Sequence, residues 1–307
     1  MQMNAFLFPG QGSQYAGMGR ELVAEFPVAR SIFEQADDAL GFSLSELCFE
    51  GPEEQLKLTE NTQPAILTCS VAFDAVLKQE GIRPHYVAGH SLGEYSALTV
   101  AGSLSFTDAV RIVRKRGQYM QSAVPQSVGA MAALIGLPPG ERDQVCETAM
   151  EGEVVSPANL NSPSQIVIAG HVAAVERAID VAKKLGAKKA ILLPVSAPFH
   201  CALMNPAKQQ LVPDLDSVEF LAPNIPLVNN FGAEVVETGV AVREGLKQQV
   251  CNPVRWEESI RRLTSLGVGH FIEVGPGRVL TGLMRSIDRS LNASNMEDLS
   301  SLEKLTS

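Results

Sequence analysis

The sequence has few of the residues that build disulfide frameworks, metal sites and membrane spans. Its five cysteines lie far apart without a CxxC pair, so neither a zinc site nor a disulfide framework is indicated. No apolar run approaches the roughly 20 residues of a membrane span. Residues 1–12 lack a basic n-region and a long apolar core, so we expect no signal peptide. These absences favour a cytoplasmic protein with reduced thiols, without a metal and without membrane contact.

Positive charge is also scarce. Lysine and arginine number 25 against 34 aspartates and glutamates, for a formal net charge of -9. No stripe of basic residues with interleaved aromatics occurs, which argues against nucleic-acid binding. An anionic ligand would therefore need a local basic site. The length of 307 residues and the 45% hydrophobic content are typical of a globular protein with a large core.

Strand and helix patterns alternate along most of the chain. Apolar runs predict strands at 5–8, 86–88, 227–229 and 270–274. Helical spacing predicts helices at 20–25, 28–40, 63–79, 94–101, 256–266 and 279–287, and Ser105 should cap a further helix that runs to about residue 123. We expect residues 292–307 to be a loosely held tail.

The pattern changes between residues 129 and 194. Strands at 130–135, 154–159, 165–169 and 189–193 and helices at 141–150 and 172–185 follow one another, with a turn at 161–164. This order is βαββαβ, the ferredoxin-like unit. We therefore predict an α/β protein in which residues 1–126 and 197–307 form a large subdomain around a parallel sheet. Residues 127–196 would form an inserted ferredoxin-like small subdomain.

A GxSxG pentapeptide stands between a predicted strand and a predicted helix. It reads Gly89-His90-Ser91-Leu92-Gly93. Flanking glycines permit a strained turn that exposes the serine Oγ, while the next amide and the helix N-terminus face developing negative charge. Ser91 is therefore a candidate nucleophile. The alternative is a glycine-rich turn with an incidental serine.

A serine nucleophile needs a base, and the chain has five histidines. His200 lies in the loop at 196–200, where the chain returns from the inserted unit, and catalytic groups gather in such loops. His90 adjoins Ser91 on a tight turn and should point away from its Oγ. The remaining three are typical of surface or hydrogen-bonded histidines: His85, His171 and His270. Cys201 could compete as a nucleophile but fits a packing role better.

Two further features suit an acyl-transfer site. The turn Gly10-Gln11-Gly12 ends a predicted strand, so its amides could converge on the crevice of Ser91. It is not a dinucleotide motif, because Tyr15 stands where a third glycine is needed. In Arg114-Lys115-Arg116 only one residue can readily face inward, and a single inward arginine is suited to hold a carboxylate.

Together these residues resemble the malonyl-CoA:acyl carrier protein transacylases of bacterial fatty acid synthesis and the related polyketide synthase acyltransferase domains. The likeness runs over residues 5–289 and depends on motifs that occur in the same order: Phe8-Pro9-Gly10-Gln11-Gly12-Ser13-Gln14, Gly89-His90-Ser91-Leu92-Gly93-Glu94-Tyr95, Arg116-Gly117, Pro198-Phe199-His200, Asn252-Pro253-Val254-Arg255-Trp256 and Glu273-Val274-Gly275-Pro276-Gly277. The resemblance implies an α/β-hydrolase-like large subdomain that carries the ferredoxin-like one.

The resemblance also implies roles for particular residues. Ser91 would carry the acyl group and His200 would be its base, oriented by the main-chain carbonyl of Gln249. Backbone amides of Gln11 and Leu92 would form the oxyanion hole. Arg116 would hold the malonyl carboxylate, and Leu92 with Phe199-His200 resembles the malonyl rather than the methylmalonyl version.

The implied reaction takes malonyl from malonyl-CoA to the phosphopantetheine thiol of a holo acyl carrier protein, by a monomeric enzyme without a cofactor. The acidic carrier could be met by Lys183, Lys184, Lys188 and Lys189 of the inserted unit, or by Arg114 and Lys115, although a solvated helix face explains them equally well. Three alternatives remain: an acyl-thioester hydrolase of the same fold, a trans-acting polyketide synthase acyltransferase, and a noncatalytic carrier-binding scaffold.

Overall fold

The computed structural model describes residues 3–125, 127–138, 140–195 and 197–307. A six-stranded sheet forms its larger part, in the order β10-β9-β1-β2-β7-β8. The strands are β1 Met3–Phe8, β2 Tyr86–Gly89, β7 Leu227–Val228, β8 Val235–Val236, β9 Val268–Val274 and β10 Asn292–Met296. All neighbouring pairs are parallel except β7 with β8. Because the central strands run the same way, their carboxyl ends meet at one edge of the sheet.

Both faces of this sheet are buried, which explains the nearly continuous apolar runs of its central strands. Successive side chains of β1 point to opposite faces. Phe6 and Phe8 belong to one core cluster, whereas Ala5 and Leu7 belong to the other. Helices therefore cover the sheet on both sides.

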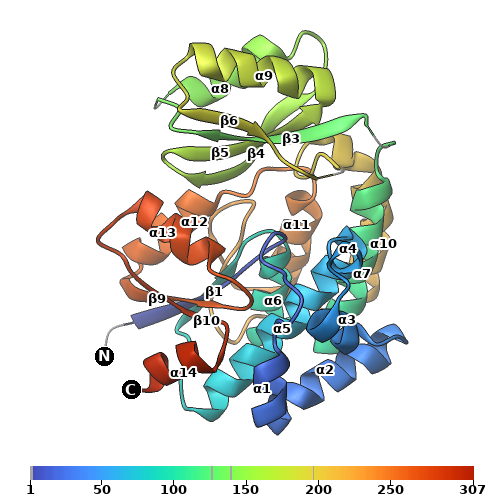
Figure 1. The fold of residues 1–307 in the computed structure, drawn as a ribbon, viewed down its shortest axis with the longest axis vertical. Helices are drawn as coiled ribbons and strands as arrows, with labels where there is room; N and C mark the ends of the chain where they lie inside the picture. Colours follow the sequence, from blue (N-terminus) through green and yellow to red (C-terminus); the bar gives the residue numbers. More distant parts are fainter. Residues whose placement is uncertain (1–2, 126, 139, 196) are drawn as a thin grey trace.

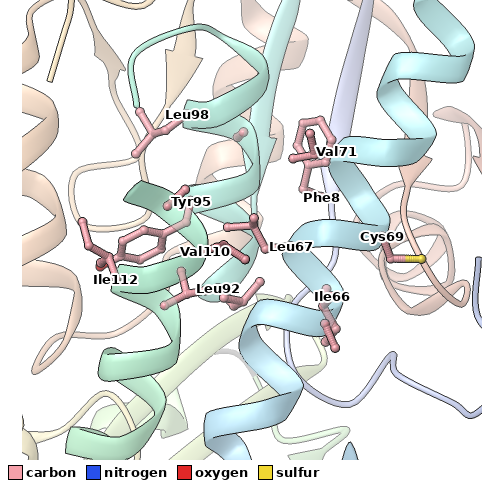
Figure 2. Packing of buried hydrophobic residues seen from close by; sticks show 14 of the residues in the cluster. Phe8, Ile66, Leu67, Cys69, Val71, Leu92, Tyr95, Leu98, Val110 and Ile112 are labelled. Atoms are coloured by element: carbon pink, nitrogen blue, oxygen red, sulfur yellow. The ribbon is translucent and has the colours of Figure 1, made fainter. Parts of the chain in front are cut away.

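The helices on the first side include α1 Arg20–Glu25, α2 Pro27–Leu40, α3 Leu44–Glu50, α4 Glu53–Leu56, α5 Thr59–Gln79, α6 Leu92–Val100, α7 Phe106–Ser122, α10 Asn205–Ser217 and α11 Gly239–Gln249. A 3-10 turn, Ala202–Met204, leads into α10. On the other side α12 Trp256–Ser265 and α13 Val279–Ile287 pack against Leu7 and Phe271. Figure 2 shows how α6 is held in the first cluster, with Leu92 and Tyr95 close to Val110 and Ile112 of α7 and to Leu67 of α5.

A second, four-stranded antiparallel sheet lies at the top of Figure 1, with α8 and α9 on its outer face. Its elements are β3 Gly129–Ile135, α8 Glu141–Ala149, β4 Val155–Ser162, β5 Gln165–His171, α9 Val172–Lys184 and β6 Lys189–Leu192, in the spatial order β4-β5-β3-β6. The predicted βαββαβ order is confirmed. Ala132 and Leu134 face the two helices, while Met131 and Ala133 join the core of the larger part.

Strand β4 of the small sheet bonds to the loop that leads into α12 of the larger part. The backbone N–H of Leu160 donates to Val254 O at 2.9 Å, and that of Val254 donates to Ala158 O at 2.9 Å. The proposed boundaries of the small subdomain, at residues 126 and 196, lie outside the described residues, as does residue 1 where the large subdomain was taken to start.

The expected loose tail is wrong. Residues 292–296 form β10, a parallel edge strand on β9, and residues 299–306 form α14 Leu299–Thr306. Asp298 caps this helix by accepting from the backbone N–H of Ser301 at 2.7 Å. The segment Asn-Ala-Ser-Asn-Met has no apolar run, so its strand depends on backbone pairing with a neighbour distant in sequence.

Smaller differences concern segments without a strong local pattern. Short or polar helices were missed at α3, α4, α10 and α11, as was β8. The turn predicted at 161–164 is narrower, because Asn161 and Ser162 still belong to β4. In the described part of the chain, no helix has both the length and the apolar character needed to cross a membrane.

Candidate active site

The chain turns sharply at the carboxyl end of β2 and presents Ser91. This residue has a φ of 53°, and α6 begins directly after it. A Cβ on Gly89 would lie 1.9 Å from the carbonyl carbon and oxygen of Gly93, and one on Gly93 would lie 2.0 Å from Phe8 O. Only glycine fits at either position. The two glycines of the motif thus allow β1, β2 and α6 to approach closely enough to form the sharp turn at Ser91, called the nucleophile corner below.

Ser91 and His200 form a hydrogen-bonded pair although 109 positions separate them. Ser91 Oγ lies 2.7 Å from His200 Nε2, and His200 Nδ1 lies 2.8 Å from the main-chain carbonyl oxygen of Gln249. A carbonyl can only accept, so Nδ1 carries the proton and Nε2 is free to accept from the serine. Both contacts lie where the resemblance implies them.

His200 is only 3% exposed, and its surroundings keep it neutral. Burial, with the positive charge of Arg116 as the next cause, lowers the pKa of His200 to about 3. The imidazole is therefore neutral at neutral pH, with Nε2 unprotonated toward Ser91. This makes His200 a candidate general base rather than a resident cation.

Arg116 projects from α7 into the same site and is 1% exposed. Its Nη2 donates to Ser91 Oγ at 3.2 Å and to Gln249 Oε1 at 2.9 Å, while Nη1 donates to Gln63 Oε1 at 2.8 Å. Its Nε has no hydrogen-bond partner among the described residues. The ring of Tyr95 lies below the guanidinium, 5.4 Å from Cζ. The cation is held by neutral groups, which leaves it suited to bind an anion.

These groups line one cavity of about 120 Å³. Gln11, Gln63, Ser91, Arg116 and His200 supply its polar wall, and its apolar wall includes Leu92, Met120, Met131, Leu193, Val195 and Phe199. The wall thus combines helix and loop residues of the larger part with Met131 of β3 and with Leu193 and Val195, which follow β6. Such a space suits a short acyl group with one charged end.

The backbone amides of Gln11 and Leu92 remain candidates for an oxyanion hole. Both residues line the cavity, and Leu92 is the first residue of α6, where backbone N–H groups lack helical partners. In the residues that the structure describes, neither amide N–H makes a hydrogen bond. The side chain of Gln11 points elsewhere and donates to Thr59 Oγ1 at 3.4 Å.

The other residues considered from the sequence lie outside this chemistry. His90 Nε2 bonds to Asn161 Oδ1 at 2.9 Å and so faces away from Ser91 Oγ. The rest pair as follows: His85 with Asn4, His171 with the N–H of Val154, His270 with Ser294, and the thiol of Cys201 with Pro198 O. Arg114 bonds to Asn61 and lies over Phe42, and Lys115 pairs with Asp214.

Sequence reasoning gave no role to two side chains that support the turn at Ser91, Asn230 and Glu94, and it assigned Gln249 a role only through its main-chain carbonyl. Asn230 accepts from the backbone N–H of Ser91 at 2.7 Å and donates to Gly89 O at 2.6 Å. The buried carboxyl of Glu94 accepts from the N–H of Asn230, and the side-chain amide of Gln249 donates to Glu94. Burial raises the pKa of Glu94 to about 7. The only local signal was an acid in the otherwise apolar and small-residue start of α6.

A serine bonded to a neutral histidine, beside an arginine that has no carboxylate partner in the described residues, is an arrangement typical of α/β enzymes that transfer acyl groups. The profile of the acyl transferase domain family matches residues 5–306. The malonyl CoA-acyl carrier protein transacylase of Escherichia coli K12 is 50% identical over 303 residues, which are 98% of both chains.

Solved structures show the same likeness. The chain superposes on an acyl carrier protein S-malonyltransferase from Vibrio cholerae with a TM-score of 0.97 at 46% identity, covering 98% of this chain and 99% of that one. It also matches a malonyl-transacylase in complex with a type II polyketide synthase acyl-carrier protein, with a TM-score of 0.96 at 48% identity and 98% coverage of both chains. The chain therefore belongs to the malonyl CoA-acyl carrier protein transacylases within the acyl transferase family.

Proposed function

We propose that this protein transfers malonyl from malonyl-CoA to the phosphopantetheine thiol of an acyl carrier protein, through an ester on Ser91, and so supplies fatty acid synthesis. One observation carries the proposal: Ser91 Oγ lies 2.7 Å from His200 Nε2 and 3.2 Å from Arg116 Nη2. The nucleophile, its base and a cation for the substrate carboxylate thus meet at one atom.

In the first half-reaction, Ser91 Oγ attacks the malonyl thioester carbon while His200 Nε2 accepts the hydroxyl proton. The oxyanion that forms is stabilised by the free amides of Gln11 and Leu92, and one such donor contributes on the order of 10²–10³ in rate. Collapse of the tetrahedral intermediate breaks the carbon–sulfur bond. His200 returns the proton to the coenzyme A thiolate, which leaves as the thiol.

The second half-reaction runs the same chemistry in reverse. The carrier's thiol gives its proton to His200 and attacks the ester, and Ser91 regains the proton as it leaves. The exchange of thioester for ester changes no oxidation state. The scheme predicts ping-pong kinetics and a malonyl-enzyme that persists when no carrier is present.

Arg116 positions and selects the acyl group. Its Nη1 and Nη2 donate to Gln63 and Ser91, which line the cavity, and a carboxylate that displaced these partners could accept from both in a bidentate geometry. Malonyl provides that carboxylate, whereas acetyl does not. The arginine is therefore the basis on which malonyl is preferred.

The carrier would approach over the basic surface of the small sheet. Lys183, Lys184, Lys188 and Lys189 are all exposed, and the next residues along the chain, Leu193 and Val195, line the cavity. Arg114 and Lys115 already have partners in Asn61 and Asp214, so they are weaker candidates. Replacing Lys188 and Lys189 by glutamate should raise KM for the carrier and leave malonyl loading unchanged, and an unchanged KM would exclude this surface.

Intact mass spectrometry tests the proposed reaction. The pure protein is incubated with equal amounts of malonyl-CoA, acetyl-CoA and methylmalonyl-CoA, and the retained acyl group is identified by its mass. We expect a malonyl adduct that is absent from Ser91→Ala and that disappears when holo carrier is added. Release of free malonate at a matching rate without carrier would instead indicate a hydrolase.

A further inference from the structure

One buried acid below the nucleophile corner is not used by the proposed mechanism. Glu94 lies in the first turn of α6 and is 2% exposed. Its Oε2 accepts from the backbone N–H of Asn230 at 3.0 Å and from Gln249 Nε2 at 2.8 Å. A carboxylate is rarely buried so completely without a charged partner. A positively charged group close enough to interact with the Glu94 carboxylate is therefore expected.

The side chain of Gln249 connects this acid to Arg116. Gln249 Oε1 accepts from Arg116 Nη2 at 2.9 Å, while its Nε2 donates to Glu94. One buried cation and one buried anion are therefore joined through a neutral amide rather than as a direct ion pair. Gln249 Oε1 thus accepts the Nη2 N–H that a direct pair would use, and no hydrogen bond joins the Glu94 carboxyl to the guanidinium in the described residues.

The groups around Glu94 come from every element that packs against it. Arg116 of α7 is the charged side chain that acts on it, and Tyr95 is its titratable neighbour on α6. The helix α11 and the loop after β7 contribute neutral Gln249 and Asn230. Of the other packing elements, β1 has no titratable side chain and β2 has Tyr86 at its start. On α5 the titratable side chains are Glu60, Cys69, Asp74 and Lys78, none of which bonds to Glu94 in the described residues.

Binding of malonyl would add a second anion to a site with one cation. The substrate carboxylate would contact the guanidinium directly, whereas Glu94 reaches it only through Gln249. A surplus charge in a buried site is costly, and a titratable group normally neutralises instead. We propose that Glu94 is the resident counter-anion of Arg116 and takes up a proton when the malonyl carboxylate binds there, an inference that rests on the proposed function.

The step is balanced as a simple proton exchange. A proton from the bulk solvent forms an O–H bond on the Glu94 carboxyl as malonyl enters, and it returns to solvent when malonyl leaves on the carrier. The buried charge thus stays constant. The pKa of free Glu94 near 7 lies where such an exchange occurs. Because the complex holds a proton that the free protein loses above this pH, malonyl affinity should fall by up to about tenfold per pH unit above it.

Calorimetry of malonyl-CoA binding to the Ser91→Ala protein measures the exchange without turnover. Titrations at about pH 8 in two buffers of different ionisation enthalpy give the number of protons taken up. With the pKa near 7 in the free protein, we expect about 0.9 proton per malonyl-CoA. Acetyl-CoA should give none. Glu94→Gln in the same background should also give none, because the amide still accepts from Asn230 and Gln249 but carries no charge.

The outcomes separate this inference from the proposed function. Two results would overturn the inference about Glu94 and leave the proposed transfer reaction standing. One is binding of malonyl-CoA without proton uptake. The other is proton uptake that persists in Glu94→Gln, which would belong to another group such as His200. Should Glu94→Gln fail to fold, infrared difference spectra of Ser91→Ala with malonyl-CoA must still gain a protonated-carboxyl band, and its absence refutes the idea. Failure of the wild-type protein to form a malonyl adduct would overturn both proposals.

Discussion

Replacing Arg116 by alanine tests the proposed carboxylate site most directly. The substitution removes the donors to Ser91 and Gln63 and would leave the malonyl carboxylate without its cation. Truncating one partner of a buried, hydrogen-bonded charge pair costs about 2–5 kcal/mol. At about 1.4 kcal/mol per tenfold change, this corresponds to a loss of about 30-fold to about 4,000-fold in kcat/KM for malonyl-CoA.

Acetyl-CoA separates the two tasks of the arginine. Its acyl group has no carboxylate, so Arg116→Ala should reduce acetyl loading only through the lost bond to Ser91 Oγ. The ratio of malonyl to acetyl loading should therefore fall by at least about tenfold, measured by rapid quench and intact mass in a single turnover. Arg114→Ala, two positions away and bonded to Asn61, is the matched control and should leave the ratio unchanged. Equal losses for both acyl groups would refute the carboxylate role.

Three further predictions concern the stability of the fold. Burial lowers the pKa of His200 to about 3, so below pH 6.5 the unfolded chain binds a proton at this residue that the folded chain does not. The buried carboxyl of Glu94, with its pKa raised to about 7, acts in the opposite direction, so the histidine is isolated by comparison with His200→Gln. The free energy of unfolding of the wild type relative to this variant should decrease as the pH falls from about 6.5, by up to about 1.4 kcal/mol per pH unit, and a difference that does not change with pH would contradict the burial argument. Gly93→Ala should lower the melting temperature and abolish loading, because its Cβ would lie 2.0 Å from Phe8 O, and a variant with wild-type loading would show that the corner can relax. Asp298→Ala removes the cap of α14 and should cost about 0.5–2 kcal/mol in urea unfolding without changing loading, whereas a silent substitution would mean that the terminal helix adds nothing.

Local sequence patterns predicted most of the elements that position the site. The strand, glycine turn and helix around Ser91 follow from short-range preferences, because only glycine fits beside the turn and the strand before it is apolar. The order of strands and helices at 129–192 could likewise be read from hydrophobic periodicity. The terminal segment could not, because β10 is polar and depends on pairing with β9.

The contacts within the site were less accessible to sequence reasoning. The pairing of Ser91 with His200, and of His200 with the carbonyl of Gln249, was implied by the family resemblance, which marks these residues but not the side chains packed behind them. The amide of Gln249 is joined to Glu94 across 155 positions, and no local pattern encodes such a contact. The sequence shows an acid at the start of this helix, but only the structure shows that it is buried and which residues it contacts.

The sequence by itself determined the candidate nucleophile, the strained turn that carries it and the succession of most elements, because each depends on residues near one another in the chain. Only the tertiary structure decided which charges face each other around Arg116. It did so because a buried cation must be balanced by whatever groups the packing of α6, α7 and α11 brings within reach, and these come from three distant segments.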